Sequence, residues 1–410
     1  MVDEFMVQIM ANGYDLVAIT ETWLQDDHDW ELNIQGHQTL LFCRLRTHQW
    51  CFLLFNVVLF HALLFGADIV EEYLLQSSPT TYTDAQTLDI RERARKLDMG
   101  QVKRNASRLF RISNTDACSH SDLFLLTVVS SNARNITQRE VIRKTWANVS
   151  QVQGYGLLTL FAIGIPQTQA TQEEIDKEYE DHRDVIQGTF PDSADNAVLK
   201  TIMIMRWTVT FCPKALFILK SDEETFVNYR SLVEYLLSLK RHAEDLYIGR
   251  VNHQMVPIRD PLSKHHVPIS LYSGKYYPDY CSSSAYVISQ DVARKVFVAS
   301  MAMGTSMPED IYVGICARKA GVVPIHSSRF SGDKHIRFNR CCYKFIFSSF
   351  GMKSEELSEA WEEINDSRQC TMLETYYGLI KCKALTYLDK LTSHGSADLE
   401  ESVIPTHPKQ

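Results

Sequence analysis

A single apolar segment, residues 50–67, constrains this chain more than any other feature of its sequence. Only Asn56 and His61 interrupt its hydrophobic side chains, and its length is near the lower limit for a helix that crosses a bilayer. Arg44 and Arg46 precede the segment and acidic residues follow it, so the positive-inside rule puts the N-terminus in the cytosol. We therefore expect a signal anchor with type II topology and a single membrane crossing.

A cleaved signal peptide is the alternative interpretation of this segment. No convincing small-x-small cleavage site lies near Gly66, and the segment begins too far from the N-terminus for a usual signal. Because a short anchor suits the thinner membranes of the early secretory pathway, we expect the protein in the Golgi membrane.

The chain beyond the anchor has features of the secretory pathway. Eight of the ten cysteines lie there, an even number that favours disulfides, although the sequence does not reveal their pairing. The alternative is that several of them are buried free thiols. Glycosylation sequons also lie beyond the anchor, at Asn105, Asn135, Asn148 and Asn365.

Charge is distributed unevenly along the chain. Residues 1–40 contain eight of the 50 acidic residues and none of the 42 basic ones, so the remainder is neutral despite a net charge of −8. A broad basic surface for nucleic acid is therefore excluded.

The first forty residues contain ITETW and resemble the start of the endonuclease domain of non-LTR retrotransposons, in which the Glu matched by Glu21 helps bind magnesium. The later catalytic segments of that nuclease are absent, so we interpret residues 1–40 as a retroelement-like leader or a disordered cytosolic tail.

The rest of the chain divides into four parts around the anchor. Residues 41–49 are a basic cytosolic flank, and residues 68–120 are expected to be a luminal stem that contains one short exposed helix at DIRERARKL. Residues 121–385 are expected to form one folded domain, and residues 386–410 a flexible tail.

Apolar runs alternate with helical patterns in the folded domain. Strands are predicted at residues 123–131, 157–165 and 215–220, and helices from Thr137, from Asn196 and at residues 230–239. In the first helix, Thr137 and Glu140 form a capping box, and Ile142 and Trp146 lie one turn apart on one face. This alternation predicts an α/β domain with a largely parallel sheet, whose ligands gather at the carboxyl ends of the strands.

Three consecutive carboxylates, Asp222, Glu223 and Glu224, follow the third predicted strand. An acidic triplet is usually a solvated loop. At the end of a buried strand in a nucleotide-binding type of sheet, a divalent-metal site becomes an equal alternative. An ion bound by one carboxylate and by substrate phosphates needs only this sparse ligation.

Six motifs follow one another beyond the anchor. They are REVIRKTW at 139–146, FAIG at 161–164, DVIQGTFPDSADNAVLKT at 184–201, LKSDEETFVN at 219–228, YYPDYCSSSAYVIS at 276–289 and PEDIYVGICA from Pro308. In this order they resemble glycosyltransferase family 31, the β-1,3-galactosyltransferase and β-1,3-N-acetylglucosaminyltransferase family, from about Leu123 to Cys382. The resemblance implies a GT-A type fold with a mostly parallel nucleotide-binding sheet, preceded by one transmembrane helix. It also implies a UDP-sugar donor, usually Mn²⁺, and inversion at the anomeric carbon to give a β-1,3 linkage.

The resemblance implies roles for individual acidic residues. Asp310 matches the Asp of the family's EDV motif and is the candidate base that takes the acceptor proton. Glu309 is expected to orient the acceptor or the base, although an acid that favours the helix dipole is the alternative. Asp222 and Glu224 match the DxD-type motif that holds the metal and the nucleotide, and the metal neutralises the leaving diphosphate.

The first motif implies a basic contact with the nucleotide. Arg139 and Arg143 are expected near the cofactor, and so is Lys144, for which a solvated helix surface is an equal alternative.

The sequence departs from the family pattern at three places. Glu replaces Asp at 223 and 224, which moves each carboxylate by more than about 1 Å at a site that needs fixed geometry. Ser283, Ser284 and Ala285 replace a glycine-containing stretch, so close backbone approach is less available. Phe350 stands where the family usually has a His that binds the metal, and His326 and His335 are the candidate substitutes.

Two functions follow from these motifs. The first is an active transferase that takes galactose or N-acetylglucosamine from UDP-galactose or UDP-N-acetylglucosamine to glycans of glycoproteins or glycolipids, alone or as a homo- or hetero-oligomer with other glycosyltransferases. The second, favoured by the altered acidic triplet, is a catalytically impaired luminal binding or partner protein. Metal-dependent nucleotide binding distinguishes them.

Overall fold

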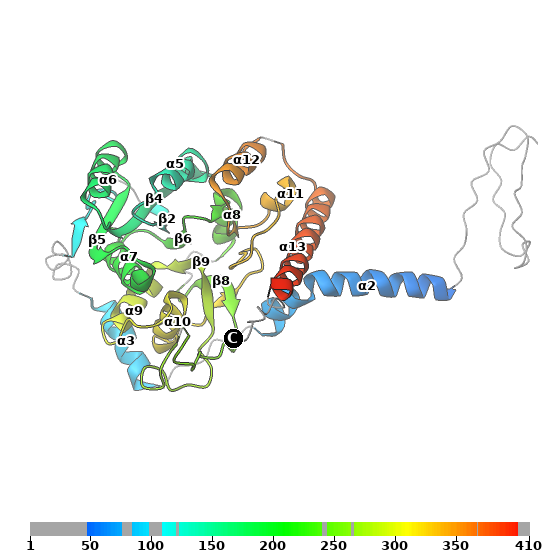
Figure 1. Ribbon diagram of the computed structural model, residues 1–410, viewed down its shortest axis with the longest axis horizontal. Coiled ribbons are helices and arrows are strands. Elements are labelled where there is room, and N and C mark those ends of the chain that lie inside the picture. The colour runs from blue at the N-terminus through cyan, green and yellow to red at the C-terminus, as the bar shows by residue number, and fades with distance from the viewer. Residues whose placement is uncertain are drawn as a thin grey trace, which may run out of the picture. The chain divides into compact units, whose positions relative to one another are not determined.

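The computed structural model of the chain is shown in Figure 1. It describes residues 47–75, 84–97, 109–119, 123–239, 244–263, 266–366 and 368–400. Residues 1–40 and the sequon at Asn105 lie outside the described residues. The chain divides into two units, residues 1–59 and residues 60–410, and the packing below is that of the second unit.

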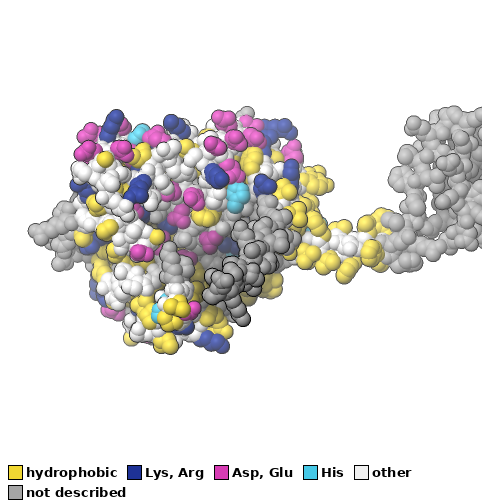
Figure 2. All heavy atoms as spheres, in the orientation of Figure 1, with side chains coloured by type: hydrophobic (Ala, Val, Ile, Leu, Met, Phe, Trp, Pro, Cys, Tyr) yellow, Lys and Arg dark blue, Asp and Glu magenta, His cyan; other side chains and the backbone are white. Residues whose placement is uncertain are grey.

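The apolar segment forms one helix. Helix α2 (Thr47–Ile69) continues as the π-helical segment η2 (Val70–Leu74). Within the described part of the chain, Trp50–Leu74 is the one stretch long and apolar enough to cross a membrane. Hydrophobic side chains cover this helix (Figure 2). This helix fits the predicted single membrane crossing.

The folded domain is built on a nine-stranded sheet with the order β1-β5-β4-β2-β6-β9-β8-β10, and β3 pairs with β4. Its strands are β1 (Phe110–Ile112), β2 (Leu123–Ser130), β3 (Gln151–Val152), β4 (Tyr155–Ile165), β5 (Val185–Pro191), β6 (Phe217–Asp222), β8 (Tyr247–Asn252), β9 (Tyr280–Ser289) and β10 (Ile325–His326). Strands β5, β4, β2 and β6 are parallel, whereas β9 runs antiparallel between β6 and β8. The predicted α/β class with a largely parallel sheet is confirmed. A separate two-stranded sheet pairs β7 (Phe226–Val227) with β11 (Ser348–Ser349).

Helices cover both faces of the large sheet (Figure 1). The described helices after the anchor are α3 (Ala85–Arg95), α5 (Ile136–Lys144), α6 (Gln169–His182), α7 (Ala197–Phe211), α8 (Tyr229–Ser238), α9 (Gln290–Ser300), α10 (Glu309–Lys319), α11 (Arg340–Tyr343), α12 (Ser354–Ile364) and α13 (Met372–Glu400). Strand β2 shows why both faces are buried, since Leu125 and Val129 pack with α5 and α8 while Leu126 and Val128 pack with α7. Side chains alternate between the faces of a strand, so its nearly continuous apolar run serves two cores.

The start of α5 differs from the sequence prediction. The helix begins at Ile136 with Asn135 as its N-cap residue, so the predicted capping box of Thr137 and Glu140 is wrong. The Asn135 side chain makes no capping bond because its amide donates to Glu223 instead. Trp146 lies in a 3₁₀ turn after α5 but is fully buried.

The folded body begins earlier than residue 121. Helix α3, expected as an exposed stem helix, buries Ile90 and Ala94 against α9, and Arg91 pairs with Asp245 at 2.7 Å. Strand β1 then joins the large sheet beside β5. Because these segments add apolar and ionic contacts, much of the expected stem belongs to the domain. At the other end, α13 continues to Glu400, past the expected boundary at residue 385.

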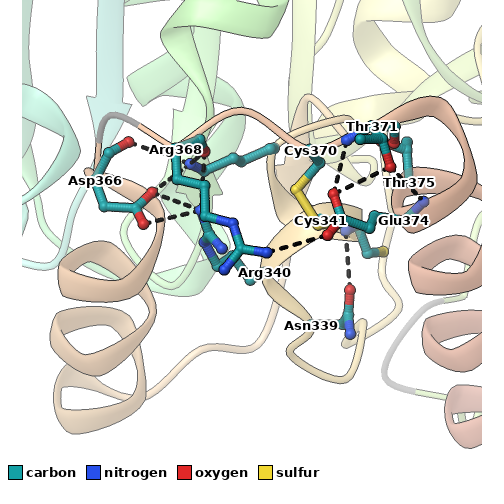
Figure 3. The surroundings of a disulfide bond; sticks show 11 residues. Asn339, Arg340, Cys341, Asp366, Arg368, Cys370, Thr371, Glu374 and Thr375 are labelled. Carbon is teal, nitrogen blue, oxygen red and sulfur yellow. Dashed lines mark hydrogen bonds and ion pairs between the residues drawn. A yellow bond between two sulfur atoms is a disulfide. The ribbon is translucent and has the colours of Figure 1, made fainter.

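The cysteines follow both of the expected patterns. Two disulfides form, Cys118–Cys212 and Cys341–Cys370, while buried free thiols remain at Cys281, Cys316, Cys342 and Cys382. Figure 3 shows how the second disulfide joins α11 to the segment before α13, next to the ion pair of Arg340 with Asp366. Both connections hold the start of α13 against the domain.

Candidate active site

The candidate site lies where two neighbouring strands end. Strands β2 and β6 are parallel, and Ser130 pairs in register with Asp222. The loops that follow them, residues 131–135 and 223–225, therefore meet at the same edge of the sheet. The acidic triplet begins here, as the sequence predicted.

A buried lysine organises this edge. Lys220 is fully buried, and its ammonium lies 2.6 Å from Asp222 Oδ1 and 3.0 Å from Glu309 Oε1, and donates to the Ser283 carbonyl at 2.7 Å. Burial lowers the pKa of Lys220, but the two carboxylates outweigh it and hold the pKa above its usual value. A charged lysine thus links the end of β6 to the start of α10. Lys220 was not among the residues predicted for the site, and its one signal in the sequence is a lone lysine inside an apolar strand.

Asp222, the first acid of the triplet, has a raised pKa. Burial raises its pKa to about 6, the positive charge of Lys220 opposes this rise, and Glu309 adds to it. Its Oδ1 is bonded to Lys220, and its other oxygen accepts no hydrogen bond from a described residue.

Glu223 faces the neighbouring loop instead of a ligand. Its carboxylate accepts hydrogen bonds from Ser131 Oγ at 2.5 Å, from the Asn132 N–H at 3.1 Å and from Asn135 Nδ2 at 2.6 Å. The longer glutamate side chain gives this carboxylate the reach to meet three donors on the β2–α5 loop. Glu223 therefore ties the two loops together.

Glu224 is exposed, and no described residue donates to its carboxylate. Its backbone is fixed, because its carbonyl accepts from the Met352 N–H at 2.9 Å. Glu224 and the second oxygen of Asp222 are hard oxygen ligands of the kind that Mn²⁺ and Mg²⁺ take. Asp222 and Glu224 are therefore the two candidate ligands that the triplet offers a divalent ion.

The two acids of the PEDIYVG motif begin α10. Asp310 is partly buried, and its Oδ1 accepts from the Ile311 N–H at 2.8 Å. Burial raises the pKa of Asp310 to about 6, the hydrogen bond from Ile311 opposes this, and Glu309 and Asp333 add to it. Glu309 is instead held by Lys220 and by Thr201 Oγ1, which donates at 2.5 Å. Asp310 therefore has the less engaged carboxylate of the two, while Glu309 is bonded to Lys220 and Thr201.

Serines at the start of β9 contact a neighbouring loop. Ser284 Oγ donates to the Gly332 carbonyl at 2.9 Å, and Ser282 Oγ donates to Asp333. Gly332 adopts a φ of +62°, and a Cβ there would lie 2.7 Å from the Arg250 side chain. The start of β9 is thus bonded to the loop that carries Asp333, a carboxylate that the sequence analysis did not single out.

The two arginines of the first motif support the site from within. Arg139 is fully buried, and its guanidinium donates to Glu178 at 2.6 and 2.8 Å and to the Asn132 carbonyl at 2.7 Å. Arg143 pairs with Glu178 and with Asp184. These bonds direct both guanidinium groups toward protein acceptors. Lys144 is exposed, in keeping with the solvated alternative.

Neither candidate histidine contacts the acidic triplet. His326 is buried, its Nδ1 accepts from the Val251 N–H at 3.3 Å, and burial with nearby Arg250 lowers its pKa to about 4. His335 lies beside Phe350, with Nδ1 at 3.3 Å from the Phe350 carbonyl oxygen and Nε2 at 3.0 Å from Glu356 Oε1.

The described sequons differ in their surroundings. Asn148 and Asn365 are exposed. Asn135 is exposed too, but the nitrogen that would carry a glycan is the one that donates to Glu223.

Comparisons with known proteins agree with this architecture. The Galactosyltransferase family model matches residues 137–328. Beta-1,3-galactosyltransferase 9 of Homo sapiens is 56% identical over 348 residues, which cover 85% of this chain and 94% of that protein. Lactosylceramide 1,3-N-acetyl-beta-D-glucosaminyltransferase of Homo sapiens is 35% identical over 282 residues, which cover 67% of this chain and 74% of that protein. Beta-1,3-galactosyltransferase 4 of Mus musculus is 31% identical over 313 residues, which cover 67% of this chain and 84% of that protein. The chain therefore belongs to glycosyltransferase family 31, the β-1,3-galactosyltransferase and β-1,3-N-acetylglucosaminyltransferase family, and has its GT-A type fold.

Proposed function

We propose that this protein is a Golgi-anchored, inverting β-1,3-glycosyltransferase that moves galactose or N-acetylglucosamine from a UDP-sugar to a glycan. Family membership and the names of the relatives support the reaction class. One observation carries the proposal. The Lys220 ammonium pairs with both Asp222, at the end of β6, and Glu309, so it holds the start of α10 and with it Asp310 close to the acidic triplet. The acceptor is a glycan of a glycoprotein or glycolipid.

Asp310 supplies the base in the proposed reaction. The acceptor hydroxyl attacks the anomeric carbon while its proton moves to the Asp310 carboxylate, and the bond to the diphosphate breaks on the opposite side. A carboxylate with a pKa of about 6 is ionised at neutral pH and holds a proton better than an ordinary Asp. Lys220 and Thr201 keep Glu309 in place beside it.

Glu224 and Asp222 would hold the divalent ion, for which Mn²⁺ is the proposed species. When bound, the ion neutralises the negative charge that grows on the leaving diphosphate. Glu223, with Ser131 and Asn135, keeps the two loops of the nucleotide side at a fixed separation.

Calorimetric titration of UDP into the purified full-length protein, with and without Mn²⁺, tests the nucleotide side. We expect binding that requires Mn²⁺. Absence of binding by a folded protein would favour the second candidate function, a luminal binding or partner protein. The observation that favours this candidate is that three protein donors already bond the Glu223 carboxylate.

A further inference from the structure

Two of the buried thiols lie together in one part of the core. Cys342 in α11 and Cys382 in α13 are each 1% exposed and belong to the same hydrophobic cluster. Interaction with the neighbouring Cys382 thiol, and burial after it, raise the pKa of the Cys342 thiol. These two sulfur atoms are therefore neighbours, although neither belongs to the two disulfides described above.

The backbones of α11 and α13 approach each other closely at this point. A Cβ added at Gly378 of α13 would lie 3.0 Å from the Cys342 nitrogen and 3.2 Å from the Cys341 Cβ. Cys382 follows Gly378 by about one turn, so its side chain lies on the same face of α13. Its Sγ donates to the carbonyl of Arg337, in the loop before α11, at 3.0 Å. Cys342 and Cys382 thus meet across the contact between the two helices.

The neighbouring disulfide leaves Cys382 to Cys342. The Cys341–Cys370 bond already joins α11 to the segment just before α13, so the two elements are held in register. Consecutive side chains of a helix point about 100° apart, so Cys341 and Cys342 are directed at different partners. Each cysteine of α11 therefore has its own partner at the start of α13 or within it.

We propose that Cys342 and Cys382 form a third disulfide in the luminal protein. The oxidant is the disulfide of a thiol–disulfide oxidoreductase or of glutathione. The Cys382 thiolate attacks one sulfur of the oxidant and releases the other as a thiolate, and the Cys342 thiolate then attacks the Cys382 sulfur and releases the first. The two cysteines lose two protons and two electrons in total, and the oxidant leaves as two thiols.

The bond forms while the chain folds. A buried thiol with a raised pKa contains little thiolate and reacts slowly, so the exchange precedes the burial of the pair. The proposal requires the luminal placement of the domain but not glycosyl transfer.

The third disulfide would restrain the segment that supports the acidic triplet. Strand β11 follows α11 and pairs with β7, which begins just after the triplet. The Met352 N–H, beyond β11, donates to the Glu224 carbonyl at 2.9 Å. A covalent link from α13 to α11 therefore anchors the beginning of a segment that ends at the candidate metal site.

Peptide mapping of the full-length protein from cultured animal cells, denatured in N-ethylmaleimide without reductant, tests the proposal. Trypsin should release residues 341–344, 369–381 and 382–383 as one disulfide-linked cluster without alkylated cysteine. In the Cys341→Ala/Cys370→Ala variant, residues 341–344 should remain bonded to residues 382–383, which assigns the pairing.

The Cys118–Cys212 disulfide in the same digest reports on the compartment. Alkylated Cys342 and Cys382 in a chain that retains Cys118–Cys212 would overturn the proposal. Alkylation of every cysteine would overturn it too, and would in addition contradict the luminal placement.

Thermal unfolding supplies a second readout. Cys342→Ala and Cys382→Ala should each lower Tm by about 5 °C, and the double variant should lower it no further, because each change removes the same bond. Cys316→Ala combined with Cys342→Ala is the matched control, since Cys316 is a buried thiol of a different core cluster and the two effects should add. Additive losses from Cys342→Ala and Cys382→Ala would identify two separate thiols and overturn the proposal.

Discussion

Asp310 is the residue on which the proposed chemistry depends. Asp310→Asn removes the base and should reduce kcat about 10²–10⁴-fold, while UDP affinity stays unchanged because the side chain does not contact the nucleotide side. Since the carboxylate must be ionised and its pKa is raised to about 6, kcat of the unmodified protein should fall as pH drops below about 6. Transfer assays across pH and UDP titration of the variant check both points. Undiminished transfer by the variant would remove Asp310 from the mechanism.

Glu223 and Glu224 offer a matched pair of neighbouring acids. Glu224→Gln should weaken Mn²⁺-dependent UDP binding and leave stability unchanged, because its carboxylate has no donor among the described residues. Glu223→Gln should instead lower the free energy of unfolding by about 1–3 kcal/mol, since it weakens three hydrogen bonds to a charged acceptor. Calorimetry and chemical denaturation separate the two effects. The opposite result, with Glu223→Gln abolishing metal-dependent binding in a stable protein, would reverse these assignments.

The position of the acidic triplet could be predicted from the sequence, but the different contacts of its three acids could not. The apolar run before Asp222 was enough to predict that the acids follow a buried strand. The partner of each acid was not predictable, because Ser131 and Glu309 lie far from the triplet in the sequence and only the fold brings them to one edge. The roles of the acids therefore depend on tertiary contacts.

At the scale of elements, α3 was misread because charge dominates DIRERARKL. Its apolar face is narrow and consists of Ile90 and Ala94, which lie one turn apart. This spacing is visible in the sequence and could have predicted a buried face. Three strands of the parallel core, β2, β4 and β6, were predicted from their apolar runs, whereas β5 was missed because Gln187 and Gly188 interrupt its apolar residues. By contrast, the antiparallel strand β9 has no local signal for its direction, which the pairing with β6 and β8 determines.

A prediction follows for the boundary of the luminal domain. A fragment that starts at residue 121 lacks α3, β1 and Cys118, so it should be less stable than one that starts at residue 84. Loss of the Cys118–Cys212 disulfide alone, which closes a separation of 94 residues, should cost about 2–5 kcal/mol. Chemical denaturation of both fragments, with Cys118→Ala/Cys212→Ala in the longer one as the comparison, measures the two contributions. If the two fragments were equally stable, residues 84–120 would belong to a stem and not to the folded domain.

At the scale of the whole molecule, the predicted topology has a direct test. With one crossing and a luminal domain, protease added to intact microsomes should leave the chain from residue 68 onward protected. Glycosidase treatment should lower its apparent mass, because Asn148 and Asn365 are exposed. Asn148→Gln and Asn365→Gln should each remove one glycan. Digestion of the domain in intact vesicles would contradict the type II orientation.

Lys220 has one ammonium for two carboxylates, Asp222 at the end of β6 and Glu309 at the start of α10. A change in the charge of either acid therefore alters how strongly the ammonium is held by the other, because the attraction between charges is strong where water is excluded. The end of β6 and the start of α10 are thus coupled electrostatically through one side chain, although they lie far apart in the sequence.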